Sequence, residues 1–299
     1  MTALTLRQSS AWQTAGAYVA LTKPRIIVEL LITTIPAMIL AANGWPNTYL
    51  VVATLIGGTL AAGSANAINM FIDRDIDGIM RRTRSRPIPS GLVTPAQAMA
   101  FATVLAVVSF LLLAFVANLL SAVLAMVALL FYVFVYTLWL KRSTPQNIVI
   151  GGAAGAMPPL VGWAAVTGTL DPAAIVLFAI IFVWTPPHFW ALALNLEADY
   201  QRAGVPMMPV VAGEASTRVQ ILLYSLLLFG VALLLVPFGA ASYFYLGSAL
   251  LLGLGFVWFA FRLWRRGTAR AAQRLFRYSL VYLALLFVAV AVDTAIGRL

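Results

Sequence analysis

The chain has 299 residues, of which 63% are hydrophobic and only 9% are charged, and its formal net charge is +10. A soluble domain carries about 25% charged residues, so this composition excludes an ordinary soluble fold and indicates an integral membrane protein. The chain has no cysteine and a single histidine, which excludes a disulfide framework, a thiolate metal site and a multi-histidine metal site.

Apolar segments of about 20 residues, long enough to cross a bilayer, recur along the chain. Residues 1–22 contain no acid and no cleavable signal pattern, and we interpret them as a cytoplasmic N-terminal segment. Residues 23–299 are predicted to form one transmembrane domain. The predicted fold is all-α, a polytopic membrane bundle of nine transmembrane helices, with spans at 26–43, 49–71, 96–117, 119–139, 146–166, 173–194, 219–238, 243–261 and 277–296.

The basic residues separate cleanly between the two sides that nine spans define. The N-terminus and the loops after the second, fourth, sixth and eighth spans hold 18 of the 19 lysines and arginines, and the other side holds only Arg298. Positively charged loops face the cytoplasm. We therefore expect the N-terminus inside and the C-terminus outside. The basic charge then reflects topology, and no nucleic-acid partner is expected.

The first polar motif follows the second span and reads Asn69-x-x-x-Asp73-x-x-x-Asp77. Carboxylates near a bilayer are costly and indicate a functional site. Steps of four place these residues, together with Asn66, on one helical face, whereas Asp75 points away. Such oxygen-bearing side chains suit a hydrated Mg²⁺ that carries a phosphate ligand. We predict Asp73 and Asp77 as metal ligands and Asn69 as a ligand or orienting group.

Basic side chains close to this motif are candidate phosphate contacts, because guanidinium groups bind phosphate oxygens bidentately. Arg84 and Arg86 follow the motif directly, in the sequence RSRPIP. Lys141 and Arg142 lie at the cytoplasmic end of the fourth span, and they fit a positive-inside flank equally well. Two further candidates, Lys23 and Arg25, flank Pro24 at the start of the first span.

The second polar motif, Asn195-x-x-x-Asp199, follows the sixth span. On a continuous helix, His188, Asn195 and Asp199 fall on one face and Glu197 on the opposite one. His188 lies about two turns deeper than Asn195, as a haem-contacting or proton-handling group would, or as a histidine satisfied by a bond between helices. Two acidic motifs and basic loops at one membrane surface favour a prenyl diphosphate substrate, whose ionisation Mg²⁺ and cationic side chains would assist.

These motifs resemble those of the UbiA-type superfamily of intramembrane prenyltransferases, which has nine helices and aspartate-rich motifs on the second and sixth. The resemblance covers residues from about 21 to the C-terminus. Its most specific pieces are LTKPR at 21–25, NMFIDRDIDGIMRRTRSRPIPSG at 69–91, Tyr136-Thr137, TPQNIVIGGAAGAMPPLVGW at 144–163 and WTPPHFWALALNLEADYQRAGVPMMPVVAG at 184–213. The last two pieces are similar to the branch of the family that prenylates haem.

The resemblance implies that the farnesyl group of farnesyl diphosphate is transferred to a vinyl group of haem b, with addition of water, giving haem O for terminal oxidases. Haem b would then be a substrate rather than a cofactor, and a downstream haem-modifying enzyme or oxidase assembly factor would be a partner. The expected location is the bacterial cytoplasmic (inner) membrane, as a multi-pass protein with its active site opening to the cytoplasmic side.

The same resemblance distributes roles among the candidate residues. It assigns the catalytic site to Asn69, Asp73, Asp77 and Asp199. One or two Mg²⁺ ions would be held by Asn69, Asp73, Asp77, Asn195 and Asp199; the second motif has a single acid in register. Substrate binding is assigned to Asn66, Arg84, Arg86, Tyr136, Lys141, Arg142, His188, Asn195, Lys23 and Arg25.

Three other interpretations are open at this stage. The first is a prenyltransferase for a different acceptor, such as a quinone precursor or a chlorophyllide. The second is a transporter or proton-coupled channel, although the acids gather at one surface and no relay crosses the midplane. The third is an oxidase assembly factor, which leaves both aspartate motifs unexplained.

Overall fold

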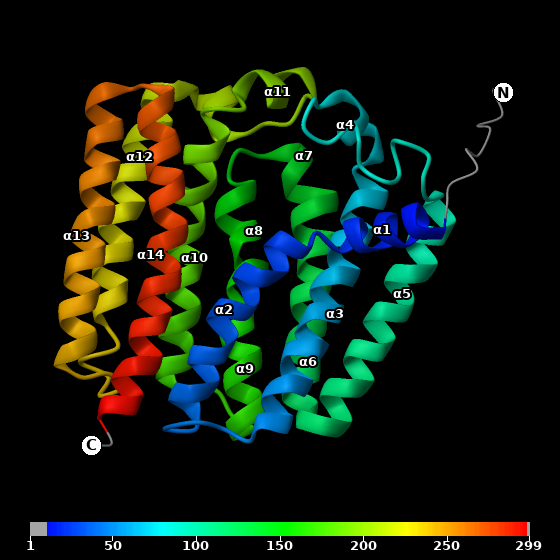
Figure 1. The fold of residues 1–299 in the computed structure, drawn as a ribbon. Coiled ribbons are helices and arrows are strands. Elements are labelled where there is room, and N and C mark those ends of the chain that lie inside the picture. Colours follow the sequence, from blue (N-terminus) through cyan, green and yellow to red (C-terminus); the bar gives the residue numbers. More distant parts are fainter. Residues whose placement is uncertain (1–10, 298–299) are drawn as a thin grey trace, which may run out of the picture.

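The computed structural model describes residues 11–297, and every regular element in that range is helical. The helices stand side by side as a bundle, with short connections at both ends (Figure 1). Arg7 and Arg298, together with the first ten residues of the predicted N-terminal segment, lie outside the described residues.

Nine helical segments within residues 11–297 are long and apolar enough to cross a membrane, which confirms the predicted number of spans. Most of their ends lie within a few residues of the predicted ones. The seventh is bounded at Met208 rather than 219, because a short helical turn precedes the main helix across a kink at Gly213, where φ is 76° and ψ is 162°. The ninth begins at Ala269 rather than 277. The spans are α2 (Pro24–Ala41), α3 (Thr48–Ile72), α5 with η1 (Pro95–Leu112, Leu113–Ala117), α6 with η2 and α7 (Leu119–Leu130, Phe131–Leu140, Lys141–Ser143), α8 with α9 (Asn147–Ala156, Pro158–Thr167), α10 (Pro172–Ala193), α12 (Met208–Leu233), α13 (Tyr243–Arg266) and α14 (Ala269–Ile296).

Three shorter helices lie at one end of the bundle. They are α1 (Ala11–Thr22), α4 (Arg74–Ile79) and α11 (Glu197–Arg202). Helices α4 and α11 lie together at the top of Figure 1, above the ends of the spans, and α1 runs across the bundle beside α3. Both polar motifs are therefore at the same end of the molecule.

Helices α8, α9 and α10 form the centre of the bundle. The most apolar window of the α8–α9 span is 72% buried and that of α10 is 67% buried, against 17% for the α5–η1 span. A protein-facing environment on nearly all sides is what a helix at the centre of a bundle experiences. The outer face of α5 is left for lipid.

Hydroxyl groups and small residues bring α3 and α5 close together. Ser109 Oγ donates to the carbonyl of Gly57 at 2.7 Å, and Ser64 Oγ donates to the carbonyl of Ala102 at 2.7 Å. Membrane helices associate through small residues and interhelical hydrogen bonds, because apolar burial gives no net gain within lipid. This pairing fixes α3, the helix that carries the first polar motif.

Candidate active site

The first polar motif occupies the end of α3 and the start of α4. Asp73 lies between the two helices, yet the backbone keeps helical spacing, with Asp73 N to Asn69 O at 2.9 Å and Asp77 N to Asp73 O at 2.8 Å. The exposed fractions of Asn69, Asp73 and Asp77 are 2%, 0% and 1%. The three side chains thus share one buried face, as the spacing predicts.

Asp73 is held by groups from two separate parts of the chain. Its Oδ2 atom pairs with Lys141 Nζ at the end of η2 and accepts a hydrogen bond from Asn69 Nδ2 at 2.8 Å. Its Oδ1 atom accepts no hydrogen bond from any residue in 11–297, and Arg142 Nη2 approaches it at 3.6 Å. A buried carboxylate oxygen without a donor is costly, which indicates an atom reserved for a ligand.

Asp77 is paired with Arg86 of the following loop. Arg86 Nη1 lies 2.7 Å from both carboxylate oxygens of Asp77. Thr83 Oγ1 donates to the backbone carbonyl of Asp77 at 3.0 Å and folds the loop back over α4. This contact brings Arg86, predicted as a phosphate contact, next to the acidic motif.

Lys23 reaches the same face from the junction between α1 and α2. It adopts a left-handed backbone conformation, with φ of 54°, and its Nζ donates to Asn69 Oδ1 at 2.8 Å. Asn66 Nδ2 donates to the carbonyl of Thr22 at 2.9 Å and fixes this junction. Burial, followed by the charges of Arg86 and Lys141, holds the pKa of Lys23 well below its usual value.

Asp75 points away from this group, as predicted. Its side chain is 61% exposed and accepts two 2.8 Å hydrogen bonds from Arg142. These bonds lower the pKa of Asp75 to about 2. The guanidinium of Arg142 is occupied by Asp75 and by the carbonyl of Ile72, so Arg142 mainly joins α7 to the ends of α3 and α4.

The π-helical segment η2 lies against the first motif. Thr137 Oγ1 accepts from Asn69 Nδ2 at 3.1 Å and donates to the carbonyl of Tyr132 at 2.8 Å. The rings of Tyr132 and Tyr136 lie 5.2 Å apart. π-Helical turns are rare and occur frequently at functional sites. Neither Tyr132 nor Thr137 was among the predicted site residues.

The second motif corrects one prediction. Helix α10 ends at Ala193 and α11 begins at Glu197, so His188, Asn195 and Asp199 do not lie on a continuous helix. Asn195 Nδ2 donates to the carbonyl of Ala191 at 3.2 Å, and Asp199 pairs with Arg202. With the turn at 194–196, α11 lies flat at the end of the bundle instead of extending α10.

An apolar cluster joins the two motifs. Ile76 and Met80 of the first loop pack in one buried group with Tyr200 of α11, and Tyr136 and Leu196 pack against it. Burial raises the pKa of Tyr200, while the nearby charges of Arg82 and Arg86 lower it. The structure therefore brings α4, α11 and η2 together around one polar region.

His188 lies below this region and is enclosed by aromatic rings. Its ring stacks on Trp184, with centroids 4.1 Å apart, and on Phe276, with centroids 4.8 Å apart. Its Nδ1 atom is 2.6 Å from Ser279 Oγ of α14. The structure thus gives His188 a partner on another helix, and only Nε2 is left for a further ligand.

Two predicted phosphate contacts do not reach the acidic motif. Arg25 and Arg84 are exposed, and no ion pair within residues 11–297 involves either of them. The gathered cations are Lys23, Arg86 and Lys141, each of which contacts a different member of the first motif.

The donor set of the first motif fits a hard divalent cation. Carboxylate and amide oxygens are the ligands that Mg²⁺ takes in proteins, usually through one or two carboxylates together with substrate phosphates. Asp73, with its undonated Oδ1, and Asp77 supply two carboxylates on one face. Within residues 11–297, no group of three or more His, Cys, Asp or Glu residues is placed to hold a metal by itself. A substrate that contributes ligands is consistent with both observations.

Comparison with known proteins places the chain in a class. The UbiA prenyltransferase family model matches residues 30–289. The chain belongs to this family, and it is a multi-pass membrane protein.

Similar proteins have specific names. The chain is 58% identical to the protoheme IX farnesyltransferase of Gloeobacter violaceus, with 93% of this chain and 91% of that protein covered. It is 56% identical to the protein of the same name from Symbiobacterium thermophilum, with 94% and 95% covered.

Solved structures share the fold. A structure concerning digeranylgeranylglyceryl phosphate synthase has a TM-score of 0.78 at 18% identity and covers 94% of this chain and 98% of that one. An Archaeoglobus fulgidus UbiA homologue bound to GPP and Mg²⁺ has a TM-score of 0.69 at 16% identity, covering 92% and 99%.

Proposed function

We propose that this protein transfers the farnesyl group of farnesyl diphosphate to a vinyl group of haem b, with addition of water, and releases haem O and diphosphate. The observation that carries the choice of acceptor is the 58% identity to a protoheme IX farnesyltransferase across 93% of the chain. The class of reaction is supported by the family and by the buried face of Asn69, Asp73 and Asp77.

The diphosphate binds where the three cations gather. In the absence of substrate, Lys23 donates a hydrogen bond to Asn69, and Arg86 and Lys141 neutralise Asp77 and Asp73. All three side chains turn toward the diphosphate oxygens when the substrate binds. Charge-assisted hydrogen bonds of this kind are about twice as strong as neutral ones. The same cations stabilise the negative charge that develops on the leaving group, so they raise the rate of ionisation.

Asn69, Asp73 and Asp77, joined by Asn195 and Asp199 of the second motif, would hold one or two Mg²⁺ ions. When bound, Mg²⁺ neutralises the diphosphate and makes it a better leaving group. The proposal is supported by the donor set of the first motif and by the Mg²⁺ in the related Archaeoglobus fulgidus structure.

The remaining groups position the two substrates. The allylic C–O bond breaks with its electron pair leaving on the diphosphate, and the faces of Tyr132 and Tyr136 stabilise the allylic cation. The vinyl carbon of haem b forms the new C–C bond. Water then adds its hydroxyl to the haem-side cation and releases a proton. His188, whose Nδ1 is held by Ser279, is assigned to the haem side through Nε2.

The site is proposed to open to the cytoplasmic side of the bacterial inner membrane. The supporting observation is that 18 of the 19 basic residues fall on the side that carries both motifs, which sets the N-terminus inside and the C-terminus outside. Farnesyl diphosphate has a long apolar chain and haem b has a large apolar macrocycle, and the bilayer supplies both laterally. Haem O passes to a haem-modifying enzyme or to oxidase assembly factors.

The test is mass spectrometry of haem after incubating the purified protein with haem b, farnesyl diphosphate and Mg²⁺. The expected product is haem that has gained a farnesyl group and one water, and this product is expected to disappear with EDTA. Unmodified haem from folded protein would contradict the assignment, and a quinone precursor would be the next acceptor to assay. If the product still forms in the presence of EDTA, the metal requirement is rejected, but the assignment of haem b as the acceptor stands.

A further inference from the structure

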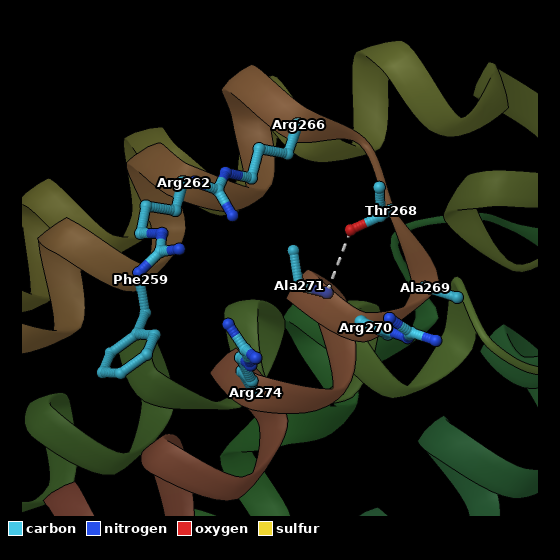
Figure 2. A pocket seen from close by; sticks show the side chains of 8 residues that line it. All are labelled: Phe259, Arg262, Arg266, Thr268, Ala269, Arg270, Ala271 and Arg274. Atoms are coloured by element: carbon cyan, nitrogen blue, oxygen red, sulfur yellow. Dashed lines mark hydrogen bonds between the residues drawn. The ribbon is translucent and has the colours of Figure 1, made fainter.

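A pocket of about 460 Å³ lies between the end of α13 and the start of α14. Phe259 forms one wall, and the charged lining consists of Arg262, Arg266, Arg270 and Arg274. In Figure 2, the side chains of Arg262, Arg266 and Arg274 surround the opening, while Arg270 extends beyond Ala271. The pocket belongs to no part of the proposed active site.

The positive charge of this pocket has no carboxylate partner. The ion pairs found within residues 11–297 involve Arg86, Lys141, Arg142 and Arg202, and none involves an arginine of the pocket. Like charges spaced four residues apart on a helix repel each other, and both Arg262–Arg266 and Arg270–Arg274 have this spacing. An anion that enters the pocket would relieve this repulsion.

The dipoles of helices α13 and α14 act differently on the arginines of the pocket. The last turn of α13 favours cations, which accounts for Arg265 and Arg266. Arg270 and Arg274 instead occupy the first two turns of α14, where the dipole disfavours positive side chains and its free N–H groups attract anions. Thr268 Oγ1 caps only the N–H of Ala271. The start of α14 thus adds attraction for an anion.

A fifth cation, Arg218, adds positive charge at the same end of helices α13 and α14. The guanidinium of Arg218, from α12, packs against Gly267 in the space that a side chain at that position would fill. Arg218 is half-buried and also takes part in no ion pair among the described residues. Glycine in the left-handed conformation at Gly267 allows this approach.

The position of the pocket relative to the membrane indicates which kind of anion it binds. Helices α13 and α14 both span the membrane, so the pocket lies at the level of the lipid headgroups. Trp258 and Trp264 of α13 are 56% and 40% exposed, and tryptophan side chains collect at the membrane–water interface. We propose that this pocket binds the phosphate of an anionic phospholipid headgroup, with the acyl chains lying along α13 and α14. Guanidinium forks match phosphate oxygens, and basic pockets between membrane helices bind such lipids.

The test is native mass spectrometry of the full-length protein in a neutral detergent, titrated with phosphatidylglycerol or with zwitterionic phosphatidylcholine. The informative pair of variants removes one arginine from each helix: R266Q/R274Q changes the pocket, and R265Q/R277Q removes the same charge outside it. Each guanidinium–phosphate contact contributes roughly a factor of ten. We therefore expect R266Q/R274Q to weaken binding of the first phosphatidylglycerol about 100-fold more than the control pair does.

Several outcomes would overturn the proposal. Equal weakening by both double variants would mean that the attraction is only general surface charge. Equal binding of phosphatidylcholine would remove the role of the net negative charge. Displacement of the lipid by an equimolar amount of inorganic phosphate would assign the pocket to a free anion instead. If R266Q/R274Q does not fold, the single variant R274Q is expected to show a roughly tenfold effect against R277Q.

Discussion

Lys141 Nζ and Asp73 Oδ2 form an ion pair between two spans, and the carboxylate of this pair is fully buried. The partners are 68 residues apart in the sequence. Lys141 comes at the end of the π-helical segment and Asp73 at the junction of α3 and α4. The pair therefore ties the fourth span to the first motif. Lys141 is positioned to leave Asp73 for an anionic ligand, and Asp73 is positioned to leave Lys141 for a cation.

Asp73→Asn and Asp77→Asn are each expected to lower kcat/KM by about three orders of magnitude, because a bound metal contributes several kcal/mol to stabilising the leaving charge. Asp75→Asn is expected to cost less than about tenfold, since Asp75 is exposed and paired with Arg142. Product formation by detergent-purified variants at matched thermal stability measures the difference. An equal loss in Asp75→Asn would refute the division of the motif into an inner and an outer face.

Gly151→Ala is expected to displace Tyr136. A Cβ at Gly151 would lie 2.3 Å from Tyr136 Cδ2, so the ring must leave its present position. We expect a five- to tenfold lower kcat/KM, which corresponds to about 1 kcal/mol. Gly155→Ala is the matched control, because it is on the same helix and a Cβ there meets nothing within 4 Å. Unequal effects in steady-state assays support the contact, whereas equal effects would reflect the helix alone.

Lys23 is expected to react with amine-acylating reagents at a lower pH than an ordinary lysine. Its pKa is lowered by burial and by Arg86 and Lys141, so at any pH below the usual value a larger fraction is unprotonated and nucleophilic. Peptide mass spectrometry across a pH series gives the midpoint of modification. Saturation with farnesyl diphosphate and Mg²⁺ is expected to protect Lys23. A midpoint at the usual lysine value would contradict its placement beside two other cations.

Asp293 is expected to stabilise the protein without a part in the reaction. Its carboxylate accepts from Ser242 N at 2.8 Å, from Tyr245 N at 2.9 Å and from Ser242 Oγ, which caps α13 from a turn of α14. Asp293→Ala is expected to lower the free energy of unfolding by about 1–3 kcal/mol, because it leaves the buried N–H of Tyr245 unpaired and removes the cap of α13. Asp293→Asn keeps one acceptor oxygen and is expected to cost less. Thermal melting at constant lipid content checks this order, and turnover of the folded fraction should stay unchanged.

The sequence predicts the spans and the inner face of the first motif because both depend on local periodicity. Apolar runs and steps of four need no knowledge of distant residues, and α3 to α4 keeps helical spacing through Asp73. The second motif is different, because the turn at 194–196 is imposed by packing of Tyr200 against Ile76 and Met80, which are distant in the sequence. The π-helical turns around Thr137 and the pairing of Arg142 with Asp75 likewise depend on tertiary contacts.

The separation of Asp73 from its partners has a consequence for biogenesis. Asn69 is synthesised before Asp73, but Lys141 and Arg142 are synthesised after it, at the end of the second span that follows the motif. A nascent chain that has inserted only α2 and α3 therefore presents an acid at the membrane surface without Lys141 of α7 to neutralise it. Burial of Asp73 must wait until the fourth helix is delivered from the translocon, so closure of the site is coupled to the order in which the spans leave the ribosome.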